Sequence, residues 1–102
     1  MTLRKALIFR VAFYTGTTNK DGQLHGIGLR WGLSSLYIGE FNKGKIDGFG
    51  WERTKNTTYV GYFKQGVKEG NGSLITHSSM KVEVGKFQNN KMVKLEYSYV
   101  IF

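Results

Sequence analysis

Residues 37–72 read YIGEFNKGKIDGFGWERTKNTTYVGYFKQGVKEGNG and contain one pattern twice. The pattern opens as Tyr-x-Gly-x-Phe and closes as Gly-x-Gly. Tyr37 and Phe41 return as Tyr59 and Phe63, and every other fixed position also returns 22 residues later. A constant period of this length is the sequence signature of a repeat architecture. The chain is therefore predicted to be a repeat protein.

The same register extends upstream of this stretch. Residues 22–28 hold an earlier Gly-x-x-x-Gly-x-Gly, and Tyr14-x-Gly16 precedes it, one residue out of register. A loop one residue longer before Gly22 accounts for that offset. No Tyr-x-Gly-x-Phe stands in register before Gly22, so the first copy departs from the motif.

Downstream, the pattern fades in a similar way. Gly85-x-Phe87 repeats the Gly-x-Phe element after 24 residues, with Glu83 in the tyrosine position and Asn90 in the position of the closing glycine. Terminal repeats that depart from the consensus are typical of capping repeats, whose outer sides meet water instead of a neighbour.

The full motif, Y-x-G-x-[FW]-x-x-G-x-x-x-G-x-G, resembles the MORN repeat (membrane occupation and recognition nexus) over about residues 14–87. Of the 14 glycines in the chain, 12 fall on motif positions. The resemblance implies a β fold and a non-catalytic role at membranes, in cytoskeletal or ciliary structures, or as a subunit of an organellar assembly. It does not select one of these roles.

The expected fold is all-β: an elongated antiparallel meander of stacked β-hairpins with about eight strands in a single domain, residues 1–102. The repeat core covers about 14–88, with capping strands in 1–13 and 89–102. No apolar stripe of period 3.6 is present, and period-2 alternation dominates. The turn-forming composition of 15–22 predicts a loop there. Strands are expected over 7–14, 24–31, 36–41, 47–53, 59–63, 69–76, 81–87 and 92–102.

The repeated aromatic residues have two interpretations. In a strand, Tyr-x-Gly-x-Phe places two rings on one face with bare backbone between them. The rings are expected to lie over glycines of the next repeat, because glycine in strands marks close approach, and so to form the core. The alternative is an aromatic face that binds a helix or extended segment of a partner protein, with Tyr37, Phe41, Trp51, Tyr59, Tyr62, Phe63 and Phe87 as its residues.

Lysines recur near the predicted hairpin turns. The chain carries 15 Lys and Arg against 7 Asp and Glu, a net charge of +8 that favours acidic partners. Lysines at a sheet edge also discourage aggregation without binding anything. The alternative function is that of a peripheral membrane module, in which these lysines bind anionic lipid or phosphoinositide. Nucleic acid is disfavoured because the rings are committed to packing. The candidate contacts are Lys43, Lys45, Lys64, Lys68, Lys86 and Lys91.

No spacing of residues predicts an active site, a metal site or a cofactor site. His25 occupies the repeat position that holds Asp47 and Glu69 in the next two copies. A position filled in turn by His, Asp and Glu is expected to bond turn backbone or solvent. We expect no catalysis, no small-molecule substrate, and a protein partner.

The first 20 residues contain Arg and Lys but no acidic residue. That composition suits a mitochondrial transit segment, whereas the aromatic and branched residues of 7–14 favour a strand that caps the sheet. The expected location is cytoplasmic, cytoskeletal or at a membrane surface, with the mitochondrion as the alternative.

Overall fold

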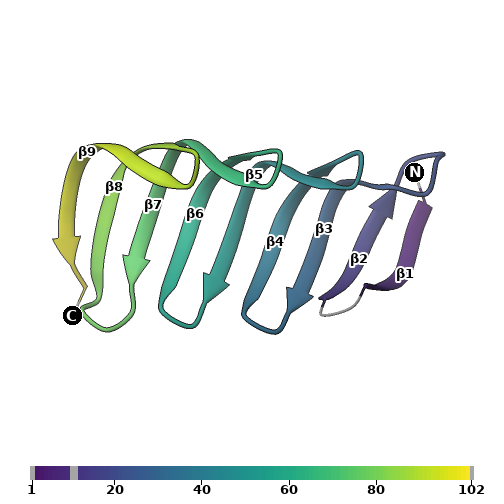
Figure 1. Cartoon of the computed structure of the whole chain (residues 1–102), viewed down its shortest axis with the longest axis horizontal. Helices are drawn as coiled ribbons and strands as arrows, with labels where there is room; N and C mark the ends of the chain where they lie inside the picture. Colours follow the sequence, from purple (N-terminus) through teal and green to yellow (C-terminus); the bar gives the residue numbers. More distant parts are fainter. Residues whose placement is uncertain (1, 10–11, 102) are drawn as a thin grey trace.

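The computed structural model describes the backbone of residues 2–9 and 12–101 and the side chains of residues 13–101. The described residues form one sheet of nine antiparallel strands, in which each strand pairs with its neighbours in sequence. Figure 1 shows the strands side by side along the long axis of a body of 42 × 23 × 20 Å. The strands are β1 (Thr2–Phe9), β2 (Ala12–Thr18), β3 (Leu24–Gly32), β4 (Ser35–Asn42), β5 (Lys45–Thr54), β6 (Thr57–Lys64), β7 (Val67–Thr76), β8 (Lys81–Gln88) and β9 (Lys91–Val100).

The all-β meander predicted from the repeat is confirmed. The single strand expected over 7–14 is wrong, because residues 7–9 belong to β1 and residues 12–14 to β2. Residues 10–11, like Met1 and Phe102, lie outside the described residues. β2 also runs to Thr18, through part of the loop expected over 15–22. The division of 7–14 between two strands gives nine described strands where about eight were expected.

Three of the hairpins turn at two-residue tips on one long edge of the sheet, the tip edge, where the first copy has a five-residue connection, residues 19–23. The first tip residues, Lys43, Gln65 and Asn89, have φ of 50–51°, and the second, Gly44, Gly66 and Asn90, have φ of 70–85°. Two successive residues with positive φ are typical of the type I′ turn, whose twist matches that of paired strands. The glycine expected at the reversal is confirmed, with Asn taking its place in the last copy.

Backbone hydrogen bonds join each tip to the repeat before it. Gly44 N–H donates to Leu24 O at 2.8 Å, and Gly66 N–H donates to Ile46 O at 2.8 Å. Asn90 N–H donates to Lys68 O at 3.1 Å. The acceptors are themselves 22 residues apart. The tip edge is therefore linked from one hairpin to the next in addition to the strand ladders.

One face of the sheet, the core face, carries a continuous line of buried rings, the ring ladder. Neighbouring rings meet edge to face with centroids 4.9–5.4 Å apart. This is the preferred geometry of aromatic pairs and stabilises by about 0.5–1.5 kcal/mol per pair beyond burial. The ladder consists, in order, of Phe41, Tyr37, Phe63, Tyr59 and Phe87.

Glycines leave room for these rings. A methyl group on Gly50 would collide with the Tyr37 ring, and one on Gly72 would collide with the Tyr59 ring. Each tyrosine thus covers a glycine of its own repeat. Phe41 lies over Gly28 of the preceding repeat. The expectation that rings cover glycines of the next repeat was therefore wrong in direction, although the pairing of ring and glycine is confirmed.

Candidate functional site

The seven predicted aromatic residues divide between the two faces of the sheet. Five of them form the ring ladder and are at most 4% exposed. Trp51 and Tyr62 lie on the opposite face, the outer face, because each follows a core-face residue in its strand. Tyr62 is 49% exposed. The core interpretation of the five ladder rings is confirmed, and their role in binding a partner stays a prediction.

The outer face exposes most of the large apolar side chains. Three aromatic pairs lie on it, Phe13 with Trp31, Phe49 with Tyr62, and Tyr97 with Tyr99. Ile27 and Ile38 lie on the same face and are also exposed. Nothing in the described part of the chain forms a second layer over this face. Exposed apolar side chains gathered on one face are typical of interaction surfaces.

A shallow groove of about 280 Å³ lies at the centre of the outer face. Gly61 and Gly72 oppose each other across β6 and β7 and form its floor with backbone atoms, because side chains at these positions would point to the core face. Phe49, Tyr62 and Val60 form its apolar wall, and Asn71 and Ser73 supply polar groups. Phe49 and Tyr62 meet edge to face, with ring centroids 5.4 Å apart.

The sequence pattern contained a signal for this surface. Ile38, Phe49 and Tyr62 stand between motif positions, so strand alternation turns them away from the ring ladder. Applying the period-2 rule to the variable positions would have placed Trp51 and Tyr62 on the outer face and identified Phe49 beside them.

The six predicted lysines do not form one continuous site. Lys43, Lys45, Lys64 and Lys91 are exposed at or beside the hairpin tips, as expected. Lys68 extends over the core face, where its Nζ lies 3.4 Å from Glu52 Oε1 and 5.4 Å from the centre of the Tyr59 ring. Lys86 lies on the outer face and donates to Asn71 Oδ1 at 2.9 Å. The tip lysines alone are arranged along one edge.

The variable position occupied by His25, Asp47 and Glu69 accepts hydrogen bonds from the next hairpin tip. The donors are the backbone N–H groups of Lys43, Gln65 and Asn89, at 3.2–3.3 Å from the acceptor atoms. The expectation that this position bonds turn backbone is thereby confirmed. The three side chains are engaged in holding the array together.

The motif tyrosines make equivalent hydrogen bonds within their strands. The Tyr37 hydroxyl donates to Glu40 O and the Tyr59 hydroxyl to Tyr62 O, both at 2.9 Å. Burial raises the pKa of Tyr59 to about 12. The pKa of Tyr37 is also raised, by burial first and then by the nearby Glu40 carboxylate. Both hydroxyls therefore remain protonated donors at neutral pH.

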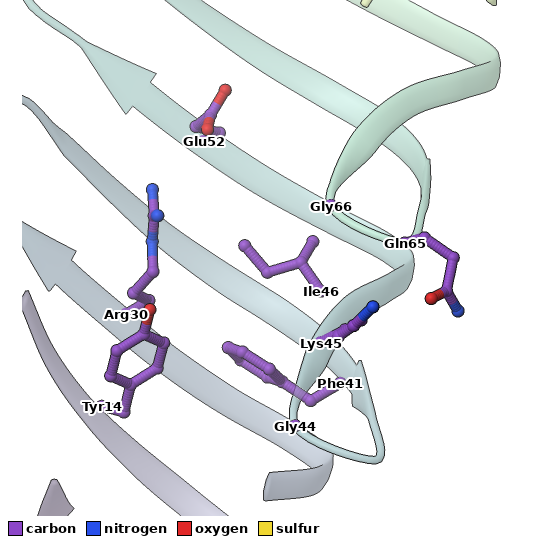
Figure 2. A pocket seen from close by; sticks show the side chains of 9 residues that line it. All are labelled: Tyr14, Arg30, Phe41, Gly44, Lys45, Ile46, Glu52, Gln65 and Gly66. Carbon is purple, nitrogen blue, oxygen red and sulfur yellow. The ribbon is translucent and has the colours of Figure 1, made fainter. Parts of the chain in front are cut away.

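A second cavity, of about 230 Å³, opens on the core face between two hairpin tips. Figure 2 shows Arg30 and Tyr14, which face each other across β2 and β3, at one end, with Phe41 and Lys45 toward the tips. Glu52 and Gln65 complete its polar lining. We call this space the Arg30 cavity. Sequence analysis did not identify Arg30, because its position holds a different residue type in each repeat.

Residues 13–101 contain no group of three or more His, Asp or Glu side chains placed to hold a metal ion. In the described residues there is also no helix of the length and apolarity needed to cross a membrane.

Comparison with known families gives one match. The MORN repeat model matches residues 37–57 and 59–78, the copies that contain Tyr37 and Tyr59. A search of curated proteins gives no match.

Proposed function

Because the chain belongs to the MORN-repeat family, whose repeats mediate protein or membrane association, we propose that it is a non-catalytic scaffold or adaptor that binds a protein partner. The family is non-enzymatic. The observation that carries the proposal is the outer face, where half-exposed aromatic and aliphatic side chains lie on a side of the sheet that no described element covers.

The outer-face groove, whose apolar wall contains Phe49 and Tyr62, is the proposed centre of the contact. Interface energy concentrates where an apolar side chain enters a pocket that excludes water. Here the backbone of Gly61 and Gly72 forms the floor of a shallow groove, which a partner's apolar side chain would cover. The net charge of +8 favours a partner segment with acidic residues around its apolar anchor.

The alternative is attachment to anionic lipid through the tip lysines. Lys43, Lys45 and Lys64 are exposed, and they would each contribute about 1 kcal/mol near an anionic surface. They lie on the edge of the sheet and not around the apolar groove. This separation makes the two functions distinguishable by mutation.

The test begins with the protein that co-purifies with the native chain and measures its affinity for defined variants. Phe49→Ser combined with Tyr62→Ser is expected to weaken binding at least about tenfold, because it removes the wall of the groove. Tyr99→Ser removes a ring of similar exposure, 51%, at the far end of the face and is the matched control. It is expected to bind within about twofold of the native chain, a difference of about 0.4 kcal/mol.

Charge reversal at Lys43 and Lys64 tests the lipid alternative. Partner affinity should persist in this variant, apart from a modest salt-dependent loss. If charge reversal abolishes both partner binding and sedimentation with anionic vesicles while the groove variant retains them, the protein-binding proposal is wrong and the lipid alternative is favoured. Circular dichroism checks that each variant is folded.

A further inference from the structure

The Arg30 cavity contains a cation without an anionic partner. Arg30 Nη2 donates to Ser35 Oγ at 2.6 Å, but Arg30 Nε is buried and has no hydrogen-bond partner among the described residues. No described carboxylate lies within 4.0 Å of the guanidinium. A buried donor that lacks an acceptor is destabilising, and more so when the group is charged.

In the neighbouring repeat an ion pair fills the equivalent place. In the next repeat, 22 residues later, Glu52 occupies the position of Arg30 and Lys68 occupies the position of Ile46. Lys68 reaches across to Glu52 at 3.4 Å and lies over the Tyr59 ring. In the first copy Ile46 carries no charge, so the side chain that completes an ion pair is absent and a cavity remains.

The local charge also favours an anion. The residues that line the cavity carry a net charge of +1, from Arg30 and Lys45 against Glu52. Glu52 is already engaged with Lys68, so its repulsion of an incoming anion is reduced. Phe41 and Ile46 supply an apolar wall beside these charges. A volume of about 230 Å³ exceeds by several times the roughly 30 Å³ that one water occupies.

We propose that the Arg30 cavity binds a carboxylate side chain of the protein partner, with the carboxylate on the Arg30 guanidinium and the methylene groups against Phe41 and Ile46. A guanidinium donates two parallel hydrogen bonds to a carboxylate, the strongest polar contact available to it. The inference rests on the proposed function, since it assigns an acidic anchor to that partner. The site lies on the core face and acts in addition to the outer groove.

The first test uses a small probe on the whole isolated chain and needs no partner. Propionate, which reproduces the end of a glutamate side chain, is titrated against ¹⁵N-labelled protein while the Arg30 Nε–Hε signal is observed. The expected result is a saturable shift with a dissociation constant on the order of millimolar. Inorganic phosphate and sodium chloride at equal ionic strength form the other two arms.

Matched variants locate the site. Arg30→Gln keeps an amide donor for Ser35 and removes the charge, so the shifts that propionate causes in the backbone around the cavity should disappear. Lys86→Gln removes one positive charge from the outer face and should leave the propionate shifts unchanged. Lys45→Gln should weaken binding a few-fold, because it removes the second cation.

Three outcomes overturn the inference: shifts that chloride reproduces, shifts that persist in Arg30→Gln, or a response to phosphate but not to propionate. Failure of the proposed function is separate. If partner affinity survives the Phe49 and Tyr62 substitutions, the outer groove is not the interface, whatever propionate does. If partner affinity falls with those substitutions but not with Arg30→Gln, the outer groove stands and the carboxylate anchor is wrong.

Discussion

At the scale of single residues, two kinds of glycine support the fold for different reasons. Gly61 faces Gly72 across β6 and β7, and a Cβ on Gly61 would lie 2.5 Å from Gly72 Cα and 2.6 Å from Asn71 O. Backbone atoms of a paired strand cannot move aside without separating the strands. A Cβ on Gly66 would meet no atom within 4 Å, so only the φ of 85° favours glycine at this position.

Substitutions at these two glycines should therefore differ in cost. Gly61→Ala is expected to lower the free energy of unfolding by roughly 1–3 kcal/mol, the range found for overpacking. Gly66→Asn is expected to lower it by less than about 1 kcal/mol, because Asn accepts positive φ. Asn90 does so at φ of 70° in the equivalent position of the last repeat. Urea unfolding of both variants measures the difference, and equal costs would contradict the strand-contact argument.

At the scale of the hairpin, each tip is held by a side chain of the previous repeat. Asp47 Oδ2 accepts hydrogen bonds from Gln65 N at 3.2 Å and from Gln65 Nε2 at 3.1 Å. Together with the backbone bond from Gly66 to Ile46, these contacts fix one hairpin against the next. The tip edge therefore contributes to stacking independently of the ring ladder.

Removing the Asp47 carboxylate should destabilise the hairpin tip. Asp47→Ala is expected to lower the free energy of unfolding by about 1 kcal/mol, the usual net value of such hydrogen bonds. Asp47→Asn retains an acceptor oxygen and should lose less than half as much. Asp21→Ala removes the same charge at an exposed residue and serves as the control. If Asp47→Ala and Asp21→Ala cost the same in thermal or urea unfolding, the side-chain link between tips contributes nothing.

The hairpin is also the scale at which sequence predicts most. The 22-residue period placed the tips, the ladder rings and the variable His25 position correctly, because each depends on local geometry that the motif repeats. Prediction failed between Phe9 and Ala12, where the sequence contains no Gly, Asn or Asp to signal a reversal. A continuous run of strand-forming residues cannot by itself show where one strand ends and another begins.

At the scale of the whole molecule, the candidate sites were less predictable than the fold. The prediction placed all seven aromatic residues on one face, although a sheet has two faces. Adjacent residues such as Tyr62 and Phe63 therefore lie on opposite sides. The Arg30 cavity involves positions that differ between copies, because Arg30 stands where the next copy has Glu52 and Ile46 stands where it has Lys68. Such a site depends on differences between repeats, which a search for their similarity does not detect.

The central claim is that the aromatic residues are divided, with the ring ladder holding the sheet together and the outer face binding the partner. Hydroxyl-radical footprinting of the chain, alone and with its co-purifying partner, tests both parts together. In the free chain, Phe49 and Tyr62 should be oxidised while Tyr37 and Tyr59, both 0% exposed, should be protected. Adding the partner should then protect Phe49 and Tyr62. Oxidation of the ladder tyrosines in the folded chain, or unchanged oxidation of Phe49 and Tyr62 in the complex, would contradict the account.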